Sequence, residues 1–306
     1  MAAIEERDAD GRKRGIRAPW IMLGPGGLWL VLFYALPLVL LLKMSLSSAS
    51  GGSDFSEFNA DPVFNWHWSN FGDALSKYGE QFGRSFAYAG IATVAAMLIA
   101  FPIAYVIAFR GGRFKNVFLG LIIIPFLTNY LIRTLAWRTV VGDQSQIVEF
   151  LRTVKLTNLF AEVGITSNPR GLLRSHLAVV GGLVYNFLPF MILPIYVAME
   201  KIDARLIDAA RDLYANTWGA FRKVVVPLSL PGVFAGSLLV FIPAAGDFVN
   251  SEYLGGVKQK MIGNVVQSEF QLNQYPVAAA LALVFMAIVM ILVVTYSSIL
   301  GTEDLT

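Results

Sequence analysis

The chain of 306 residues contains no cysteine and only two histidines. Without cysteine, neither disulfides nor thiol chemistry is available to it. His67 and His176 have no carboxylates at metal-ligand spacing, so a metal site is not expected. The phosphate-binding pattern G-x-x-x-x-G-K-[ST] is also missing, so any ATP hydrolysis linked to this chain must come from another subunit.

Charged residues are sparse over long stretches of the sequence. Hydrophobic residues make up 56% of the chain and charged residues 15%, and the mean hydropathy is +0.60. Since about 20 apolar residues cross the hydrocarbon core of a bilayer, apolar runs of this length indicate membrane-spanning helices. Such runs predict an all-α membrane protein with about six transmembrane helices, at residues 20–44, 85–109, 117–141, 177–199, 232–249 and 277–300.

The distribution of lysine and arginine predicts the orientation. Basic residues are concentrated in 1–19, 110–116 and 200–231, which lie on one side of the membrane if the six runs all span it. By the positive-inside rule, the N-terminus is expected in the cytoplasm. The chain then divides into a cytoplasmic tail (1–19), a transmembrane domain (20–300) and a short C-terminal tail (301–306). These basic residues account for the net charge of +3, so nucleic-acid binding is not expected.

A polar segment at 200–231 separates the fourth and fifth apolar runs. Asp203 is a plausible helix N-cap. Apolar residues then recur at spacings of three and four, which places them on one helical face: Ile202, Leu206, Ala209, Ala210 and Leu213. Asp208 and Arg211 fall beside or opposite this face. Because two alanines let another backbone approach closely, we expect a docking helix for a soluble partner.

Polar residues interrupt the third apolar run. Asn129, Arg133 and Trp137 are spaced by four, so one helical face gathers an amide, a guanidinium and an indole, and Tyr130 lies beside them. An arginine at depth in the membrane costs on the order of 3 kcal/mol. Arg133 therefore either lines a polar cavity or pairs with a carboxylate on another helix.

Asp247 forms a second polar site, at the end of the fifth run. A carboxylate there must meet a cation or face water. It is either a transient site for a cationic solute or half of a structural salt bridge, for example with Arg133. Tyr185 and Asn186 in the fourth run are further candidates for lining a path.

The polar segment resembles the cytoplasmic EAA loop of bacterial ABC importer permeases. The resemblance rests on Asp208-Ala209-Ala210 followed, at the family's spacing, by Val224, Val226 and Pro227. Tyr214 stands where the family has a glycine, and we expect it to pack against a neighbour instead of forming a positive-φ bend.

Two further motifs resemble the first permease subunit of spermidine/putrescine importers. They are Pro125-Phe126-x-Thr128-Asn129-Tyr130-Leu131-Ile132-Arg133-Thr134-x-Ala136-Trp137 and Gly246-Asp247-Phe248-Val249-x-x-x-Tyr253-Leu254-Gly255-Gly256. With the loop, the resemblance runs from about Phe71 to the C-terminus. It implies a type I ABC importer permease fold with a cytoplasmic coupling helix, in a bacterial inner membrane.

The resemblance also implies roles and partners. The chain would be a non-catalytic subunit without a cofactor. Its partners would be a second permease, two ATPase subunits that bind ATP and Mg²⁺, an extracytoplasmic binding protein and membrane lipid. ATPase coupling would fall to Asp203, Leu206, Asp208, Ala209, Ala210, Arg211, Leu213 and Tyr214. The translocation path would include Asn129, Tyr130, Arg133, Trp137, Tyr185, Asn186 and Asp247.

Three alternatives to a polyamine importer remain open from the sequence. The first is an ABC permease for another small solute, such as ferric iron, sulfate or phosphonate. The second is an ATP-independent carrier, which the docking helix and the absence of an internal repeat argue against. The third is a membrane scaffold that transports nothing, in which a buried Asp247 and Arg133 would have no evident use.

Overall fold

The computed structural model describes residues 17–48, 62–154, 171–214 and 216–300. Within these ranges, five helical segments are long and apolar enough to cross a membrane. A bent pair of helices adds a sixth if the pair is counted as one span. The prediction of an all-α membrane protein with about six transmembrane helices is therefore confirmed.

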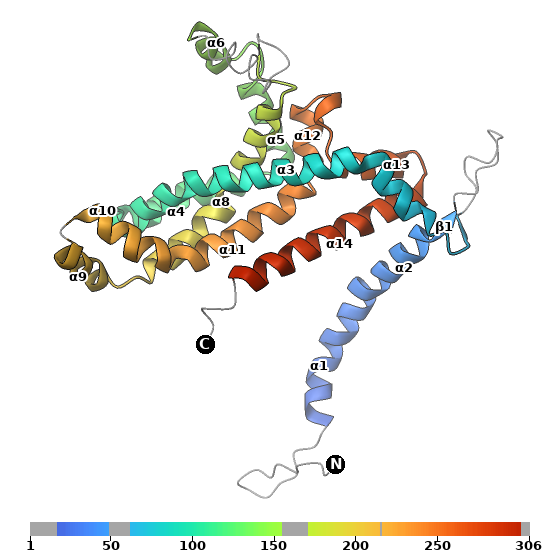
Figure 1. Cartoon of the computed structure of the whole chain (residues 1–306), viewed down its shortest axis with the longest axis horizontal. Helices are drawn as coiled ribbons and strands as arrows, with labels where there is room; N and C mark the ends of the chain where they lie inside the picture. Colours follow the sequence, from blue (N-terminus) through green and yellow to red (C-terminus); the bar gives the residue numbers. More distant parts are fainter. Residues whose placement is uncertain (1–16, 49–61, 155–170, 215, 301–306) are drawn as a thin grey trace, which may run out of the picture.

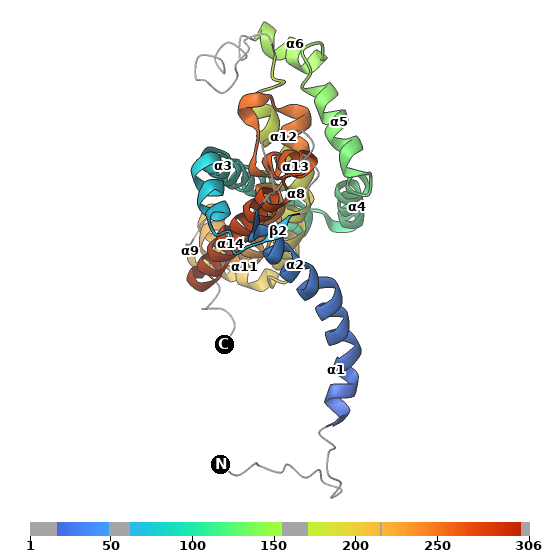
Figure 2. The same cartoon turned by 90° about the vertical axis from the view of Figure 1, so that its right-hand side faces the viewer.

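The N-terminal helix leaves the body of the molecule. In Figures 1 and 2 it extends to one side, while α5 and α6 extend to the opposite side. It consists of α1 (Arg17–Leu30), a π-helical turn η1 (Val31–Ala35) and α2 (Leu36–Ser45), and α2 packs against α14. Two short antiparallel strands follow, β1 (Ser47–Ser48) and β2 (Val63–Phe64), with Ser47 opposite Phe64.

Four long helices form the central bundle (Figures 1 and 2). They are α3 (Ser69–Tyr105, continued by the π-helical turn η3, Val106–Arg110), α8 (His176–Glu200), α11 (Val226–Ala245) and α14 (Tyr275–Leu300). Small residues let these helices approach closely, as is common between membrane helices. On α3 they form a fully buried stripe of Ala89, Ala92, Ala96, Ala100 and Ala104.

The remaining elements gather at the two ends of the bundle and beside it. One end, here the α9 end, carries η4 (Gly112–Phe114), α9 (Ala204–Tyr214), α10 (Thr217–Ala220) and the π-helical turn η5 (Phe221–Val225). The opposite end, the α12 end, carries α12 (Val249–Leu254), η6 (Val257–Gln259) and α13 (Ile262–Gln271). The bent pair is α4 (Lys115–Phe126) and α5 (Tyr130–Val140), and α6 (Gln146–Thr153) follows it.

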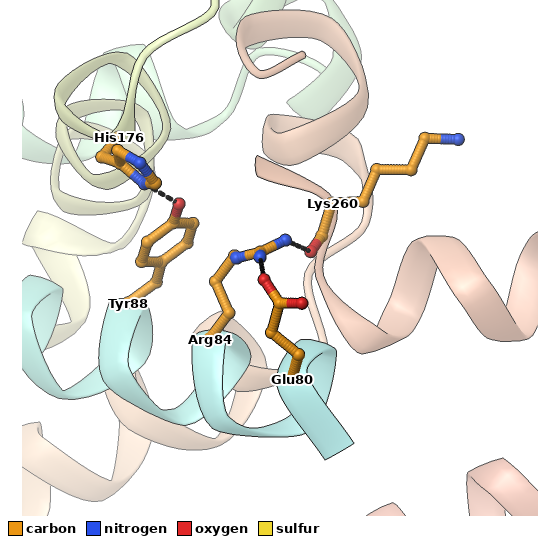
Figure 3. Close-up of polar contacts among 5 residues, drawn as sticks. All are labelled: Glu80, Arg84, Tyr88, His176 and Lys260. Atoms are coloured by element: carbon orange, nitrogen blue, oxygen red, sulfur yellow. Dashed lines mark hydrogen bonds and ion pairs between the residues drawn. The ribbon is translucent and has the colours of Figure 1, made fainter. Parts of the chain in front are cut away.

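Polar contacts hold the α12 end together, as Figure 3 shows. Arg84 on α3 forms an ion pair with Glu80 and donates a hydrogen bond of 3.0 Å to the carbonyl oxygen of Lys260, just before α13. One turn further along α3, the Tyr88 hydroxyl is hydrogen-bonded to Nδ1 of His176 at the start of α8. Three segments distant in sequence are therefore fixed to one another at this end.

The boundaries of two spans differ from those predicted. The second span begins at Ser69 instead of residue 85, because Ala74 and Phe82 in this polar stretch pack against Ile262 and Leu281. The fifth begins at Trp218 instead of residue 232, because the helix continues through η5, where Phe221 packs against the rings of Phe101 and Tyr105. In both cases packing extends the helix into sequence that hydropathy alone assigns to a loop.

The third predicted span, 117–141, is not one continuous helix. It breaks after Phe126, and the two halves meet at an angle of 94°. The Thr128 hydroxyl donates a hydrogen bond of 2.7 Å to the carbonyl oxygen of Pro125, which occupies an acceptor at the end of α4. Asn129 then caps the start of α5, where its side chain accepts a hydrogen bond of 2.8 Å from the backbone N–H of Leu131.

Candidate functional site

The break between α4 and α5 brings Tyr130 against the end of α11. Its hydroxyl donates a hydrogen bond to Oδ2 of Asp247, which lies two residues after α11. The side chain of Asn250 on α12 donates to the same hydroxyl at 2.6 Å and to the same carboxylate oxygen at 3.2 Å. The backbone N–H of Asn250 donates to the other carboxylate oxygen at 2.7 Å. Asp247 is 8% exposed, so these donors take the place of water around a buried acid.

The cluster continues onto α8. Asn186 is fully buried, and its Nδ2 donates to Oδ1 of Asn250 at 3.1 Å and to the hydroxyl of Thr134 on α5 at 3.2 Å. We call Tyr130, Thr134, Asn186, Asp247 and Asn250 the polar cluster. It joins α5 and α8 to the end of α11 and the adjoining α12, so it connects three parts of the sequence that are far apart.

Arg133 does not form a salt bridge with Asp247. It is 8% exposed, and its guanidinium lies over the rings of Phe126 and Tyr130, with centroid distances of 4.9 Å and 5.7 Å. Among the described residues no carboxylate pairs with it. The sequence analysis considered a pairing of Arg133 with a carboxylate on another helix and a salt bridge between Arg133 and Asp247. Neither is present among the described residues, and Asp247 is instead held by Tyr130 and Asn250.

The expected face of Asn129, Arg133 and Trp137 is only partly present. Asn129 precedes the first turn of α5 and its side chain serves as the cap, so it does not lie on a helical face with the other two. Trp137 stacks on Tyr185 of α8, with ring centroids 5.2 Å apart and planes inclined by 10°. The indole N–H of Trp137 is buried and has no acceptor among the described residues.

Sequence reasoning missed three contributors to this site. Thr134 is part of the first motif and Asn250 occupies an unspecified position of the second, and neither is among the predicted site residues; Phe126 is not predicted as a cation contact. The signal available was position: Asn250 follows Asp247 by three residues, and Phe126 immediately precedes the break. The contact of Asn250 with Tyr130 joins residues 120 positions apart, which sequence patterns within one helix cannot predict.

The polar segment at 200–231 contains the expected docking helix, which is α9. Asp203 is its N-cap, since Oδ1 accepts a hydrogen bond of 2.9 Å from the backbone N–H of Arg205. Leu206, Asp208 and Ala209 are exposed, whereas Ala210 is only 5% exposed. Within this chain, α9 packs against α10 and η5. Ala210 is therefore covered by its own chain, and Leu206 with Ala209 remains open to a partner.

Three of the expected coupling residues are Arg211, Leu213 and Tyr214, whose side chains lie outside the described residues. The backbone of α9 is helical through Tyr214. The proposed packing of Tyr214 against a neighbour stays a prediction.

Comparison with known families gives the context of this arrangement. Residues 96–301 match the family described as the inner membrane component of binding-protein-dependent transport systems. The chain belongs to this family. The match covers most of the central bundle, every residue of the polar cluster and the whole of α9, which are the parts that carry the candidate sites.

Two curated relatives of this permease match most of its length, and a third matches about half of it. The spermidine/putrescine transport system permease protein PotB of Haemophilus influenzae is 36% identical over 269 residues, which cover 88% of this chain and 89% of the relative. PotB of Escherichia coli is 33% identical over 270 residues, covering 88% and 92%. The permease PotC of Escherichia coli is 27% identical over 146 residues, covering 48% and 53%.

Solved structures show the same fold. A chain of a bacterial ABC transporter involved in the import of alginate superposes with a TM-score of 0.60 at 13% identity, covering 94% of this permease and 96% of that chain. A chain from the bacterial alginate ABC transporter in complex with a pentasaccharide-bound periplasmic protein gives 0.55 at 14% identity, covering 92% of each. At these identities the likeness establishes the ABC importer permease fold alone.

Proposed function

We propose that this permease is a membrane subunit of an ATP-driven polyamine importer, with spermidine or putrescine as cargo. The names of its relatives at 33–36% identity support this cargo over ferric iron, sulfate or phosphonate. The names of these relatives also favour an ATP-driven importer over an ATP-independent carrier or a scaffold. The chain would form half of the translocation path and would perform no covalent chemistry.

The observation that carries the proposal is the buried carboxylate of Asp247 beside aromatic rings. Asp247 is held by neutral donors, Tyr130 and Asn250, so its negative charge is not matched by a cation within the described chain. A polyamine carries ammonium groups along an aliphatic stem. Carboxylate and aromatic faces are the groups that attract an ammonium, with cation–π contacts contributing about 0.5–2 kcal/mol.

Such a site must bind its cargo weakly enough to let it go. Hydrogen bonds from Tyr130 and Asn250 spread the charge of Asp247 and lower its pull on an ammonium. Trp137 stacked on Tyr185 offers a second aromatic surface further along α5. We assign these residues, with Asn186, to the path.

The same proposal assigns α9 to coupling. A soluble ATPase subunit would bind the exposed side of α9 around Leu206 and Ala209. ATP and Mg²⁺ would be bound by that ATPase subunit and not by this chain. Two ATPase copies, a second permease and an extracytoplasmic binding protein complete the assembly. A relative of the PotC type and the alginate transporter with its periplasmic protein support the last two partners.

Uptake of radiolabelled spermidine into vesicles that contain the co-purified subunits tests the function. We expect ATP-dependent uptake that unlabelled putrescine reduces and that sulfate or ferric iron does not. Asp247→Asn removes the charge but keeps the shape, and we expect uptake to fall at least about tenfold while basal ATP hydrolysis is retained. Absence of spermidine uptake by the intact assembly, or unchanged uptake by Asp247→Asn, would contradict the proposal.

A further inference from the structure

The guanidinium of Arg133 lies against two aromatic rings at the bend between α4 and α5. It lies over Phe126 and Tyr130, the last residue of α4 and the first of α5. Phe126 packs edge-on against Phe190 with centroids 4.8 Å apart, and Tyr130 lies 6.1 Å from Phe187, both on α8. We call Phe126 and Tyr130, the two rings that Arg133 contacts, the aromatic cage, and Phe187 and Phe190 of α8 support it. Aromatic faces attract a cation that lies over them.

Arg133 is an unusual occupant for this cage. A buried guanidinium is ordinarily paired with a carboxylate that satisfies its donors. Here Nε of Arg133 is buried without an acceptor among the described residues, and Asp247 is held by Tyr130 and Asn250. The rings are thus the contacts that stabilise the charge of Arg133 within the described chain.

Tyr130 connects this cation to the acid. Its ring faces Arg133 while its hydroxyl donates to Asp247. An ammonium in the cage would therefore touch the same aromatic face as Arg133 and lie next to the carboxylate of the polar cluster. The chain's own cation thus occupies a position whose surroundings suit a cationic cargo.

We propose that Arg133 is a resident cation, which fills the cage when cargo is absent and which an ammonium group of the polyamine displaces. This inference rests on the proposed function, because it needs a cationic cargo. Two cations compete for one set of rings, so the site binds cargo only when Arg133 swings out or α5 moves. The permease thereby holds a closed site against stray cations and keeps its affinity for cargo low enough for release.

Direct binding of radiolabelled spermidine to the purified transporter, without ATP and without the binding protein, tests this role. Removing the resident charge with Arg133→Gln is expected to tighten spermidine binding about tenfold, which corresponds to about 1.4 kcal/mol. Arg133→Met, which keeps an apolar stem of similar reach, gives the same test if the glutamine variant does not assemble. Arg133→Lys keeps a cation and should bind spermidine like the unaltered protein.

Two further variants separate this role from a general effect on charge or packing. Arg138→Gln removes an exposed cation from the same helix and should leave spermidine affinity unchanged. Adding Phe126→Leu to Arg133→Gln removes one wall of the cage and should abolish the gain. Tighter spermidine binding by both Arg133→Gln and Arg138→Gln would indicate a nonspecific charge effect and would overturn the inference.

The outcomes distinguish this inference from the proposed function. If the unaltered assembly takes up spermidine with ATP but Arg133→Gln and Arg133→Met bind it no more tightly, Arg133 is not a competitor for the cage and the inference fails while the function stands. If the unaltered assembly takes up no spermidine, the function itself fails and the inference falls with it.

Discussion

Tyr130 connects the buried acid of the polar cluster to the rest of the site. Its hydroxyl donates to Asp247 and accepts from Asn250, so its removal leaves both partners short of a hydrogen bond. A buried polar group that loses its partner pays the desolvation penalty of that group, about 1–3 kcal/mol. The hydroxyl belongs to the same ring whose face Arg133 contacts.

Tyr130→Phe is therefore expected to destabilise the permease by about 1–3 kcal/mol, although it keeps the ring and its cation–π contact. The apparent melting temperature of the purified complex measures this loss. Tyr253→Phe, which alters an exposed tyrosine on α12, is the matched control and should melt like the unaltered protein. Equal melting of the two variants would mean that the hydroxyl of Tyr130 does not support Asp247.

At the scale of elements, close approach between α8 and α11 depends on glycine. A Cβ atom placed at Gly232 would lie 2.5 Å from the carbonyl oxygen of Pro194 and 2.9 Å from the Cα of Ile195. Both neighbours are backbone atoms of α8, so the helices must separate to admit even a methyl group. Gly90 on α3 is different, because nothing lies within 4 Å of a Cβ placed there.

Gly232→Ala should accordingly lower the stability of the permease by about 1–3 kcal/mol through overpacking, against the gain in helix propensity that alanine normally brings. Gly90→Ala should be neutral or slightly stabilising, since it brings the propensity without the clash. Thermal unfolding of both variants in the same detergent compares them. A stable Gly232→Ala protein would show that α8 and α11 lie further apart than this structure has them.

Hydropathy was enough to predict which elements exist, because a spanning helix must bury about 20 apolar residues in lipid. It could not place their ends, because packing with Ile262 and Leu281 extends α3 into polar sequence. It also missed the 94° bend, although Thr128 and Asn129 are helix-ending and helix-starting residues. Predicting the bend would have required treating Thr128 and Asn129 as the end of one helix and the start of the next, although the residues around them are mostly apolar.

The polar cluster shows a different limit of sequence reasoning. Tyr130, Asn186 and Asp247 could be chosen singly, because a polar side chain in an apolar run needs a reason. Their mutual contacts could not be predicted, since periodicity describes one helix at a time and Tyr130 lies 117 positions from Asp247. The pairing of Asp247 with Arg133 was predicted from their opposite charges alone. In the structure, neutral hydrogen-bond donors contact Asp247 and aromatic rings contact Arg133.

At the scale of the whole molecule, the two ends of the bundle have different partners in the proposed assembly, so their sides of the membrane decide the mechanism. The α9 end carries the turn at Arg113, and the α12 end carries η6 with Val257, which is 86% exposed. In Figure 1 α9 lies at the left of the bundle, and α13, which follows η6, at the right. Coupling to a cytoplasmic ATPase requires the α9 end to face the cytoplasm.

The absence of cysteine makes this orientation directly measurable, because a single introduced thiol is the only reactive one in the chain. In spheroplasts, a membrane-impermeant maleimide should label Val257→Cys without lysis and Arg113→Cys only after the membrane is opened. The unaltered chain supplies the background for both. Labelling of Arg113→Cys in intact spheroplasts would place α9 outside the cell, where no ATPase could bind it, and would remove the basis for coupling through this helix.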